Sequence, residues 1–144
     1  MTRLSLVPAL VFAVSVMSAG CAGHSNSPND TPLGQPFDLR AGSSAVLDGG
    51  LKVMFERVPA DSRCPMDAFC VRAGEALVAL TISQDGRDAV ARELRTDPAA
   101  AAETTYSGYS IKLLTLAPYP RSGAPILPGD YVATFTVRVQ GSGF

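Results

Sequence analysis

The chain has 144 residues, and its 12 basic and 13 acidic side chains give a formal net charge of −1. No stripe of lysine or arginine runs along it, which argues against a nucleic-acid partner. The length suits one domain with one hydrophobic core. The chain contains three cysteines and one histidine, His24. Chemistry that needs several cysteine or histidine ligands is therefore limited to these four residues.

The first twenty residues have the pattern of a secretory signal peptide. Arg3 precedes an apolar run over residues 4–17, and this run is shorter than the about 20 apolar residues that a membrane-spanning helix needs. Ser18-Ala19-Gly20-Cys21 then resembles the lipobox of bacterial lipoproteins, with Ser18 where that family prefers leucine. The resemblance implies cleavage before Cys21, lipidation of this cysteine and an acyl anchor in a membrane. An ordinary signal peptidase site is the alternative.

Residues 21–35 are small, polar and rich in turn formers. Such a segment cannot bury enough apolar surface to offset its ordering entropy. We therefore expect a flexible tether here, followed by a folded domain over residues 36–144. Ala22 follows Cys21, and in Gram-negative lipoproteins an aspartate at that place favours the inner membrane. The resemblance thus implies an outer-membrane lipoprotein that faces the periplasm of a bacterial cell envelope.

From residue 37 onward, apolar residues recur with a period of two, as in strands with one buried and one solvated face. In the clearest run, residues 131–140, the apolar face is Tyr131, Ala133, Phe135, Val137 and Val139. We expect strands over residues 37–40, 44–47, 51–56, 76–82, 89–95, 109–116 and 131–140. This pattern predicts an all-β fold, either an antiparallel β-sandwich or a small barrel of six to seven strands.

Turn-forming residues separate several of these strands. Asp48-Gly49-Gly50 and Gln84-Asp85-Gly86 both predict tight hairpins, because glycine adopts positive φ without penalty. Thr96-Asp97-Pro98 is followed by four alanines. That segment predicts one or two helical turns near residues 97–103, with Thr96 or Asp97 as the cap.

Cys64 and Cys70 enclose five residues and remain as a pair once Cys21 is assigned to a lipid. A zinc site would need further cysteine or histidine ligands, and the spacing is not that of a C-x-x-C redox motif. In an oxidising compartment we expect a disulfide between them. A structural staple is the simpler interpretation, and a labile, switch-like disulfide is the alternative.

Around these cysteines the chain resembles a group of small bacterial lipoproteins, most of which are described only as uncharacterised. The resemblance is carried by Asp61-Ser62-Arg63-Cys64-Pro65 and by Cys70-Val71-Arg72-Ala73-Gly74 before a strand. Segments 109–120 and 130–133 are also similar to that group. Arg72 stands where the group usually has tryptophan, so a role built on aromatic stacking does not transfer to this chain.

Two interpretations fit the charged residues of the cysteine loop. In the structural one, Asp61 and Arg63 lie on the same side of an extended segment and pair, or Arg63 caps strand-end carbonyls. In the functional one, Arg63, Asp67, Phe69 and Arg72 form a partner-binding loop on a rigid support. We favour the structural role for Asp61 and Arg63, and a place for Phe69 in the core.

Residues for catalysis are few. His24 lies in the expected tether, so nucleophilic chemistry has no base held by the fold. The carboxylates Asp61, Asp67, Glu75 and Asp130 could supply a pair for glycoside chemistry, but turns and solvent faces place carboxylates there anyway. We therefore expect a non-catalytic binding or scaffolding domain with no metal, no cofactor and an envelope protein as partner.

Two other functions stay open at this point. One is an inhibitor of a secreted or host hydrolase, a protease or a lysozyme, which would use a protruding loop over residues 65–69 or 121–128. The other is a weakly active enzyme or calcium-dependent module built on Asp61, Asp67 and Glu75.

Overall fold

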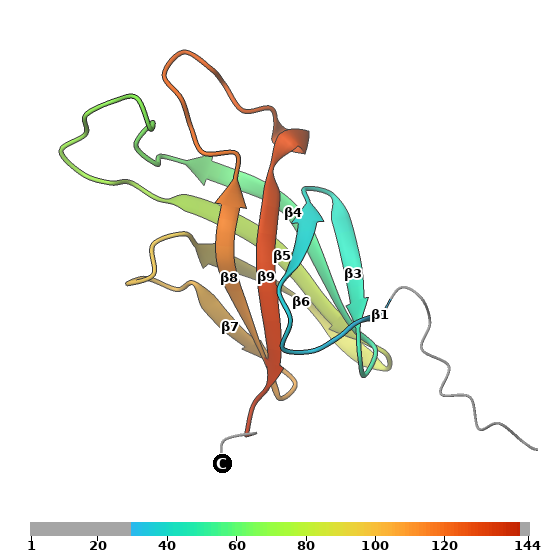
Figure 1. Ribbon diagram of the computed structural model, residues 1–144. Helices are drawn as coiled ribbons and strands as arrows, with labels where there is room; N and C mark the ends of the chain where they lie inside the picture. Colours follow the sequence, from blue (N-terminus) through green and yellow to red (C-terminus); the bar gives the residue numbers. More distant parts are fainter. Residues whose placement is uncertain (1–29, 142–144) are drawn as a thin grey trace, which may run out of the picture.

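The computed structural model describes residues 30–141, so the expected signal peptide, Cys21 and His24 lie outside the described residues. The described chain forms nine strands and one short 3₁₀ helix (Figure 1). In chain order they are β1 (Asp30–Thr31), β2 (Phe37–Arg40), β3 (Ser43–Leu47), β4 (Leu51–Asp61), β5 (Ala76–Gln84), β6 (Arg87–Arg95), β7 (Glu103–Tyr106), β8 (Tyr109–Ala117), η1 (Pro128–Asp130) and β9 (Val132–Val139). Within residues 30–141, no helix is long and apolar enough to span a bilayer.

The strands form two sheets that pack face to face (Figure 1). One sheet has the order β1-β3-β4-β5-β6, and the other has the order β2-β9-β8-β7. Neighbouring strands are antiparallel, except that the two-residue strand β1 lies parallel to β3. The predicted all-β fold is confirmed, and of the two expected architectures the β-sandwich is the one observed.

The core lies between the sheets and is filled by alternate residues of the long strands. In β4, Leu51, Val53 and Phe55 are fully buried, as the period-two pattern predicts. The Phe135 ring of β9 lies 6.2 Å from the Phe55 ring, edge to face, and 6.1 Å from the Phe37 ring, centroid to centroid. Full burial of such side chains contributes about 1.5–3 kcal/mol each, so this cluster stabilises the contact between the sheets.

The apolar face of β9 is shorter than expected. Tyr131, Ala133, Phe135 and Val137 are buried, whereas Val139 is 47% exposed. Val139 pairs with Tyr109 at the end of the sheet. The inward face of this strand therefore ends at Val137.

Residues 97–103 do not form the expected helical turns. The Ala99 N–H donates to Asp97 Oδ1 at 2.9 Å, and the Ala100 N–H donates to the Asp97 carbonyl at 3.0 Å. These bonds make one tight turn, after which β7 begins at Glu103. Alanine favours helices, but here the Ala101 and Ala102 carbonyls accept the N–H groups of Arg95 and Leu113, at 2.9 and 2.8 Å, and so bond to the two sheets instead.

Strands β1 and β7 are not predicted by the sequence pattern. β1 falls in the segment expected to be a tether, and Gly34 donates its N–H to the Val137 carbonyl at 2.7 Å. Residues 30–34, part of the expected tether, are therefore hydrogen-bonded to the sandwich. β1 has only two residues, and the four residues of β7 (ETTY) include a single buried one, Tyr106, so neither shows an apolar alternation.

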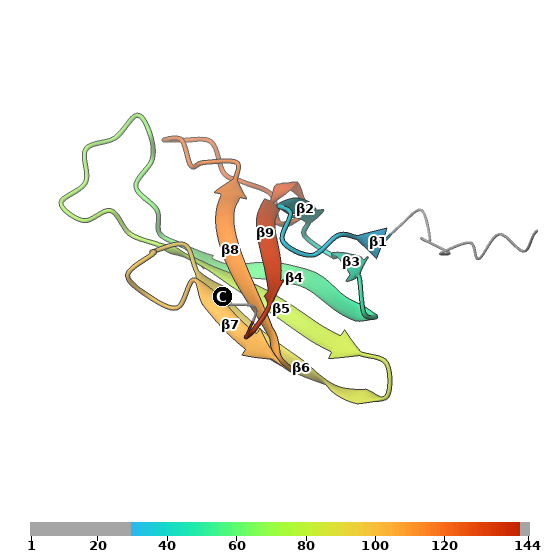
Figure 2. The same cartoon turned by 60° about the horizontal axis from the view of Figure 1, so that its bottom comes forward.

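The two ends of the sandwich differ. Tight turns join β3 to β4 and β5 to β6 at one end, as Asp48-Gly49-Gly50 and Asp85-Gly86 predict. β4 has eleven residues and therefore runs for about 35 Å to the other end. There, two long loops project beyond the sheets (Figures 1 and 2). β1 pairs with the end of β3 that adjoins the tight turn, so Asp30 lies away from the long loops.

Candidate functional site

The candidate site is the pair of long loops at this end. Loop 62–75 connects β4 to β5 and contains both described cysteines, and loop 118–131 connects β8 to β9 and contains η1. Both loops extend from the same end of the sandwich in two views of the molecule (Figures 1 and 2). We call them together the loop pair.

The neck of loop 62–75 continues the ladder between β4 and β5. The Ser62 N–H donates to the Glu75 carbonyl and the Cys64 N–H donates to the Ala73 carbonyl, each at 2.8 Å. Gly74 has φ +65°, and a Cβ atom there would collide with the Ser62 carbonyl oxygen. Only glycine fits both the conformation and the space, so Gly74 lets the two sides of the neck approach.

A disulfide closes the outer part of the loop. Cys64 and Cys70 are bonded, with their Cα atoms 6.0 Å apart, and the predicted pairing is confirmed. Inside the ring, the Ala68 N–H donates to the Pro65 carbonyl at 3.1 Å and forms a turn. The ring of residues 64–70 is therefore braced both covalently and by its own backbone.

Arg63 connects the two loops from the inside. Its guanidinium donates to both carboxylate oxygens of Asp61, from Nε at 2.9 Å and from Nη2 at 2.6 Å. It also donates from Nη1 to the Leu116 carbonyl at 2.7 Å and from Nη2 to the Pro118 carbonyl at 3.0 Å. Its Cζ lies 5.0 Å from the centre of the Tyr119 ring, which adds a cation–π contact. The predicted pairing with Asp61 and the capping of strand-end carbonyls are both confirmed.

The Asp61 carboxylate completes this network. Burial alone would raise the pKa of Asp61, but the hydrogen bonds and charge of Arg63, with a further bond from the Tyr131 hydroxyl at 3.2 Å, hold its pKa below the ordinary value. Burial, and then the charge of Asp61, raise the pKa of Tyr131. The carboxylate is thus ionised and the phenol protonated at neutral pH, which is the state in which all these bonds form.

Two further hydrogen bonds join the outer parts of the loops. The Met66 N–H donates to the Pro120 carbonyl at 3.0 Å, and the Ser122 N–H donates to Asp67 Oδ1 at 2.8 Å. The Ser122 backbone N–H, assisted by the charge of Arg121, holds the pKa of Asp67 below its ordinary value. The loop pair is therefore linked at its base through Arg63 and at its outer part through Asp67.

The four residues expected to form a partner-binding loop do not share one environment. Asp67, Phe69 and Arg72 are exposed. Arg63 is buried, so it supports the loop and does not contact a partner directly. The expected place of Phe69 in the core is wrong, because its side chain is 108% exposed. The disulfide and the bond between Met66 and Pro120 hold the loop away from the sheets, and Phe69 therefore has no core within reach.

Other apolar side chains of the loop pair are exposed as well. Val71 is 104% exposed and Met66 is 57% exposed, and in the other loop Leu127 is 63% exposed. The sequence pattern does not single out Met66, Val71 and Leu127. Their apolar character is visible in the sequence, but only the fold shows that nothing in the described chain covers them.

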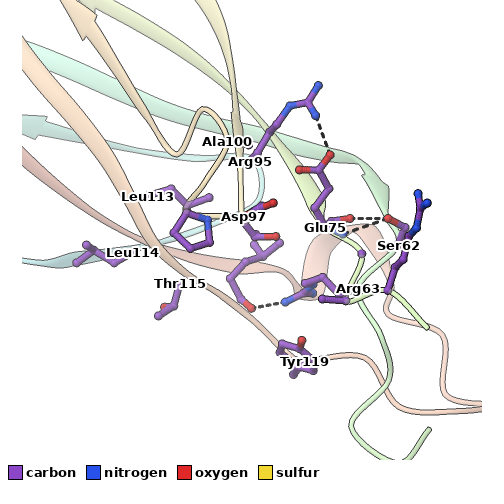
Figure 3. A pocket seen from close by; sticks show the side chains of 16 residues that line it. Ser62, Arg63, Glu75, Arg95, Asp97, Ala100, Leu113, Leu114, Thr115 and Tyr119 are labelled. Atoms are coloured by element: carbon purple, nitrogen blue, oxygen red, sulfur yellow. Dashed lines mark hydrogen bonds and ion pairs between the residues drawn. The ribbon is translucent and has the colours of Figure 1, made fainter. Parts of the chain in front are cut away.

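A groove of about 860 Å³ lies at the base of loop 62–75. Figure 3 shows Leu113, Leu114 and Thr115 of β8 along one side, with Ser62 and Glu75 on the other. The groove exists because β7 pairs with β8 only as far as Lys112, which leaves the second half of β8 paired with β9 on one edge and without a strand on the other. Sequence patterns do not report such a mismatch in strand length.

The carboxylates considered for catalysis or calcium binding do not converge. Asp61 is paired with Arg63, and Glu75 accepts a hydrogen bond from Arg95 Nη1 at 2.7 Å. Asp67 accepts the Ser122 N–H at the outer part of the loop. Within residues 30–141, no group of three or more histidine, cysteine, aspartate or glutamate side chains could hold a metal ion.

None of the protein-family models, curated proteins or solved structures compared with the chain matches it. What the chain does must therefore be argued from the loop pair and from the N-terminal sequence.

Proposed function

We propose that this chain is a lipid-anchored, non-catalytic binding domain of the bacterial cell envelope. Cys21 carries the acyl chains, in the outer membrane on the periplasmic side, and the loop pair makes contact with another envelope protein. One observation carries the proposal. The loop pair is braced from within and yet presents apolar side chains, Phe69 and Val71 among them, that the domain itself does not cover.

The rigidity of the loop pair supports a binding role, as opposed to a surface loop without a function. A loop with no contact to make gains nothing from exposed apolar side chains, which cost free energy in water. A rigid loop loses little conformational entropy when it binds, so preorganisation raises affinity. In the loop pair the rigid frame comes from Arg63, Asp67 and the disulfide, and the exposed contacts come from other residues.

The position of Asp30 is compatible with both a membrane anchor at Cys21 and a binding role of the loop pair. Cys21 precedes Asp30 by nine positions, which is at most about 30 Å of extended chain. Asp30 joins the domain at the end away from the loop pair. A domain held through Cys21 can therefore present the loop pair away from its own membrane.

The charged residues support a non-catalytic role. A general acid or base must be free to exchange a proton with substrate. Asp61 and Glu75 are each occupied by an arginine. These ion pairs stabilise the neck of the loop and leave neither carboxylate free to act as a general acid or base.

The proposal is tested in two steps on native material. Intact-mass measurement should find a mature chain that begins at an acylated Cys21, and Cys21→Ser should release the protein from the membrane fraction. Chemical crosslinking in intact envelopes should then recover the protein with a small set of envelope proteins. An unmodified cysteine would refute the anchor, and recovery of the protein without any crosslinked neighbour would refute the binding role.

Inhibition of a secreted or host hydrolase is a second candidate function, favoured by one feature. Residues 65–69 project on a stapled ring with Phe69 fully exposed, which is the shape a hydrolase inhibitor needs to enter an active-site cleft. The test is titration of the purified domain against a panel of serine proteases and lysozymes. A stoichiometric complex with loss of hydrolase activity would support inhibition, and unchanged activity across the panel would remove this candidate.

A further inference from the structure

The outer tip of loop 62–75, residues 65–71, is convex and apolar. Met66, Phe69 and Val71 lie close together in the sequence on the ring and just beyond it. Single exposed apolar side chains are ordinary on protein surfaces. A cluster of three on one projecting segment is a typical mark of an interaction site.

The tip is held in place by the rest of the loop pair. The disulfide closes the ring, and the bonds from Met66 to Pro120 and from Ser122 to Asp67 fasten it to the neighbouring loop. Phe69 therefore does not reach the sheets, and its exposure is a property of a braced segment. A partner would meet these side chains already in position.

Two cations accompany the apolar tip. Arg72 follows Val71 directly, and Arg121 lies next to Ser122, which bonds to the tip through Asp67. Neither arginine forms an ion pair within residues 30–141. The tip therefore offers apolar contacts with positive charge beside them, although the whole chain is slightly acidic.

We infer that residues 65–71 seat in a recessed apolar pocket of an envelope protein, with Phe69 as the central contact and with carboxylates on the pocket rim facing Arg72 and Arg121. The inference rests on the proposed function, which supplies the location. Aromatic residues, methionine and arginine are enriched at protein interfaces, and aromatic and arginine side chains dominate their binding energy. A projecting tip fits a recess rather than a flat surface.

A lipid bilayer is the competing surface, and two observations favour a protein. Asp67 lies two residues from Phe69 and accepts the Ser122 N–H, so insertion of the tip into a bilayer would carry a charged carboxylate into apolar surroundings, which costs free energy. The tip also lies at the end of β4 away from Asp30. A domain anchored through Cys21 can therefore hold its tip away from the membrane.

Site-specific photo-crosslinking in the producing cell tests the inference on the full chain. The photoreactive residue p-benzoylphenylalanine is placed at position 69, at position 114 in the groove, or at position 139 at the opposite end of the sheet. Leu114 and Val139 are exposed and so make suitable comparison sites. We expect one discrete protein adduct from position 69 and none from position 139.

The adduct alone does not establish the pocket, so the affinity of the purified partner is measured next. Phe69→Ala should weaken binding by at least about 30-fold, as expected for a central interface residue. Val139→Ala is the control, an exposed apolar residue at the opposite end of the sheet, and should change affinity by less than about threefold. Arg72→Gln should weaken binding mainly at low salt, because an ion pair at a rim is screened.

Each alternative outcome overturns the inference in a recognisable way. Phospholipid adducts from position 69 would assign the tip to the bilayer, and equal affinities of Phe69→Ala and Val139→Ala would remove the pocket. Protein adducts from position 114 alone would place the partner in the groove, so that the proposed function stands and the inference fails. No adduct from positions 69 and 114 would overturn both. An unacylated Cys21 would refute the membrane anchor but would leave the inference about residues 65–71 unaffected.

Discussion

The two ends of the sandwich connect neighbouring strands in different ways. At one end, Asp48-Gly49-Gly50 and Asp85-Gly86 reverse the chain within a few residues, through glycines with positive φ. At the other end, the loop pair is held by a buried arginine, a disulfide and hydrogen bonds between loops. Tight turns follow from local backbone chemistry, whereas long ordered loops depend on tertiary contacts.

The comparison also separates two kinds of apolar residue. Phe135 of β9 is fully buried between the sheets, and Phe69 of the loop pair is fully exposed. Burial makes the first a source of stability, while the second adds nothing to the fold and is free to serve a partner. The same residue type therefore has opposite consequences at the two places.

The largest effect is expected in the core. Phe135→Ala should lower the free energy of unfolding by about 3–5 kcal/mol, because it removes the ring that contacts Phe37 and Phe55. Chemical denaturation measures this change. Val139→Ala, an exposed site on the same strand, should stay within about 0.5 kcal/mol. A loss below about 1 kcal/mol for Phe135→Ala would show that the assigned register of β9 is wrong.

Arg63→Ala should come next, at about 3 kcal/mol. The substitution leaves the Asp61 carboxylate with only the Tyr131 hydroxyl and its own backbone neighbours, and it releases the Leu116 and Pro118 carbonyls. Arg72→Ala is the matched control, since Arg72 is exposed in the same loop, and it should change stability by less than about 0.5 kcal/mol. Equal effects of the two substitutions would show that Arg63 stabilises the fold no more than the exposed Arg72 does.

Removal of the disulfide should cost about 2 kcal/mol, because the ring is short and constrains the unfolded chain only modestly. The variant carries Cys64→Ala together with Cys70→Ala, and its thermal unfolding is compared with that of the wild type. Wild-type protein in a reducing agent should unfold like the double variant. A double variant as stable as the oxidised wild type would show that the bond does not stabilise the fold.

Gly74→Ala should cost about 1–2 kcal/mol more than Gly86→Ala. Both glycines have positive φ, but only at Gly74 does a Cβ atom meet another part of the chain, the Ser62 carbonyl. The difference between the two variants in denaturant unfolding therefore measures the close approach at the loop neck. No difference would mean that the neck widens without cost.

The smallest effect concerns pH. The pKa of Asp61 is lowered in the folded state, so ionised Asp61 contributes its full stability above its ordinary pKa and loses it as the pH falls through the folded-state value. Stability should decline below about pH 5, and Asp61→Asn should flatten that decline. The pKa of Asp67 is also lowered, chiefly by the Ser122 N–H, but this carboxylate is exposed, so Asp67→Asn should flatten the decline less than Asp61→Asn does. An unchanged acid profile for Asp61→Asn would contradict the role given to Arg63.

Local patterns in the sequence predict most of the sandwich. The period of two places Leu51, Val53 and Phe55 on the buried face of one strand, and the Asp-Gly sequences at residues 48–49 and 85–86 predict both hairpins. Local patterns fail where an element is short or where a neighbour decides its conformation. The alanines after Pro98 form a turn instead of a helix, and β7 is too short to be recognised.

The loop pair is predicted only in part. The pairing of Asp61 with Arg63 spans two positions, and the disulfide joins the only cysteines left after Cys21 is assigned. The bond from Arg63 to the Leu116 carbonyl joins residues 53 positions apart. A local sequence pattern covers only a few positions and cannot predict such a contact. For the same reason the sequence cannot tell whether Phe69 is covered.

By itself, then, the sequence determined the alternation of apolar and polar residues, the tight turns and the cysteine pairing, since each depends on backbone geometry or chemistry over a few positions. Only the tertiary structure decided that the loop pair shares one end, that Arg63 is inside it and that Phe69 is outside. Those facts depend on which distant segments meet when the sheets pack. Such contacts arise from the whole fold and from no single stretch of the chain.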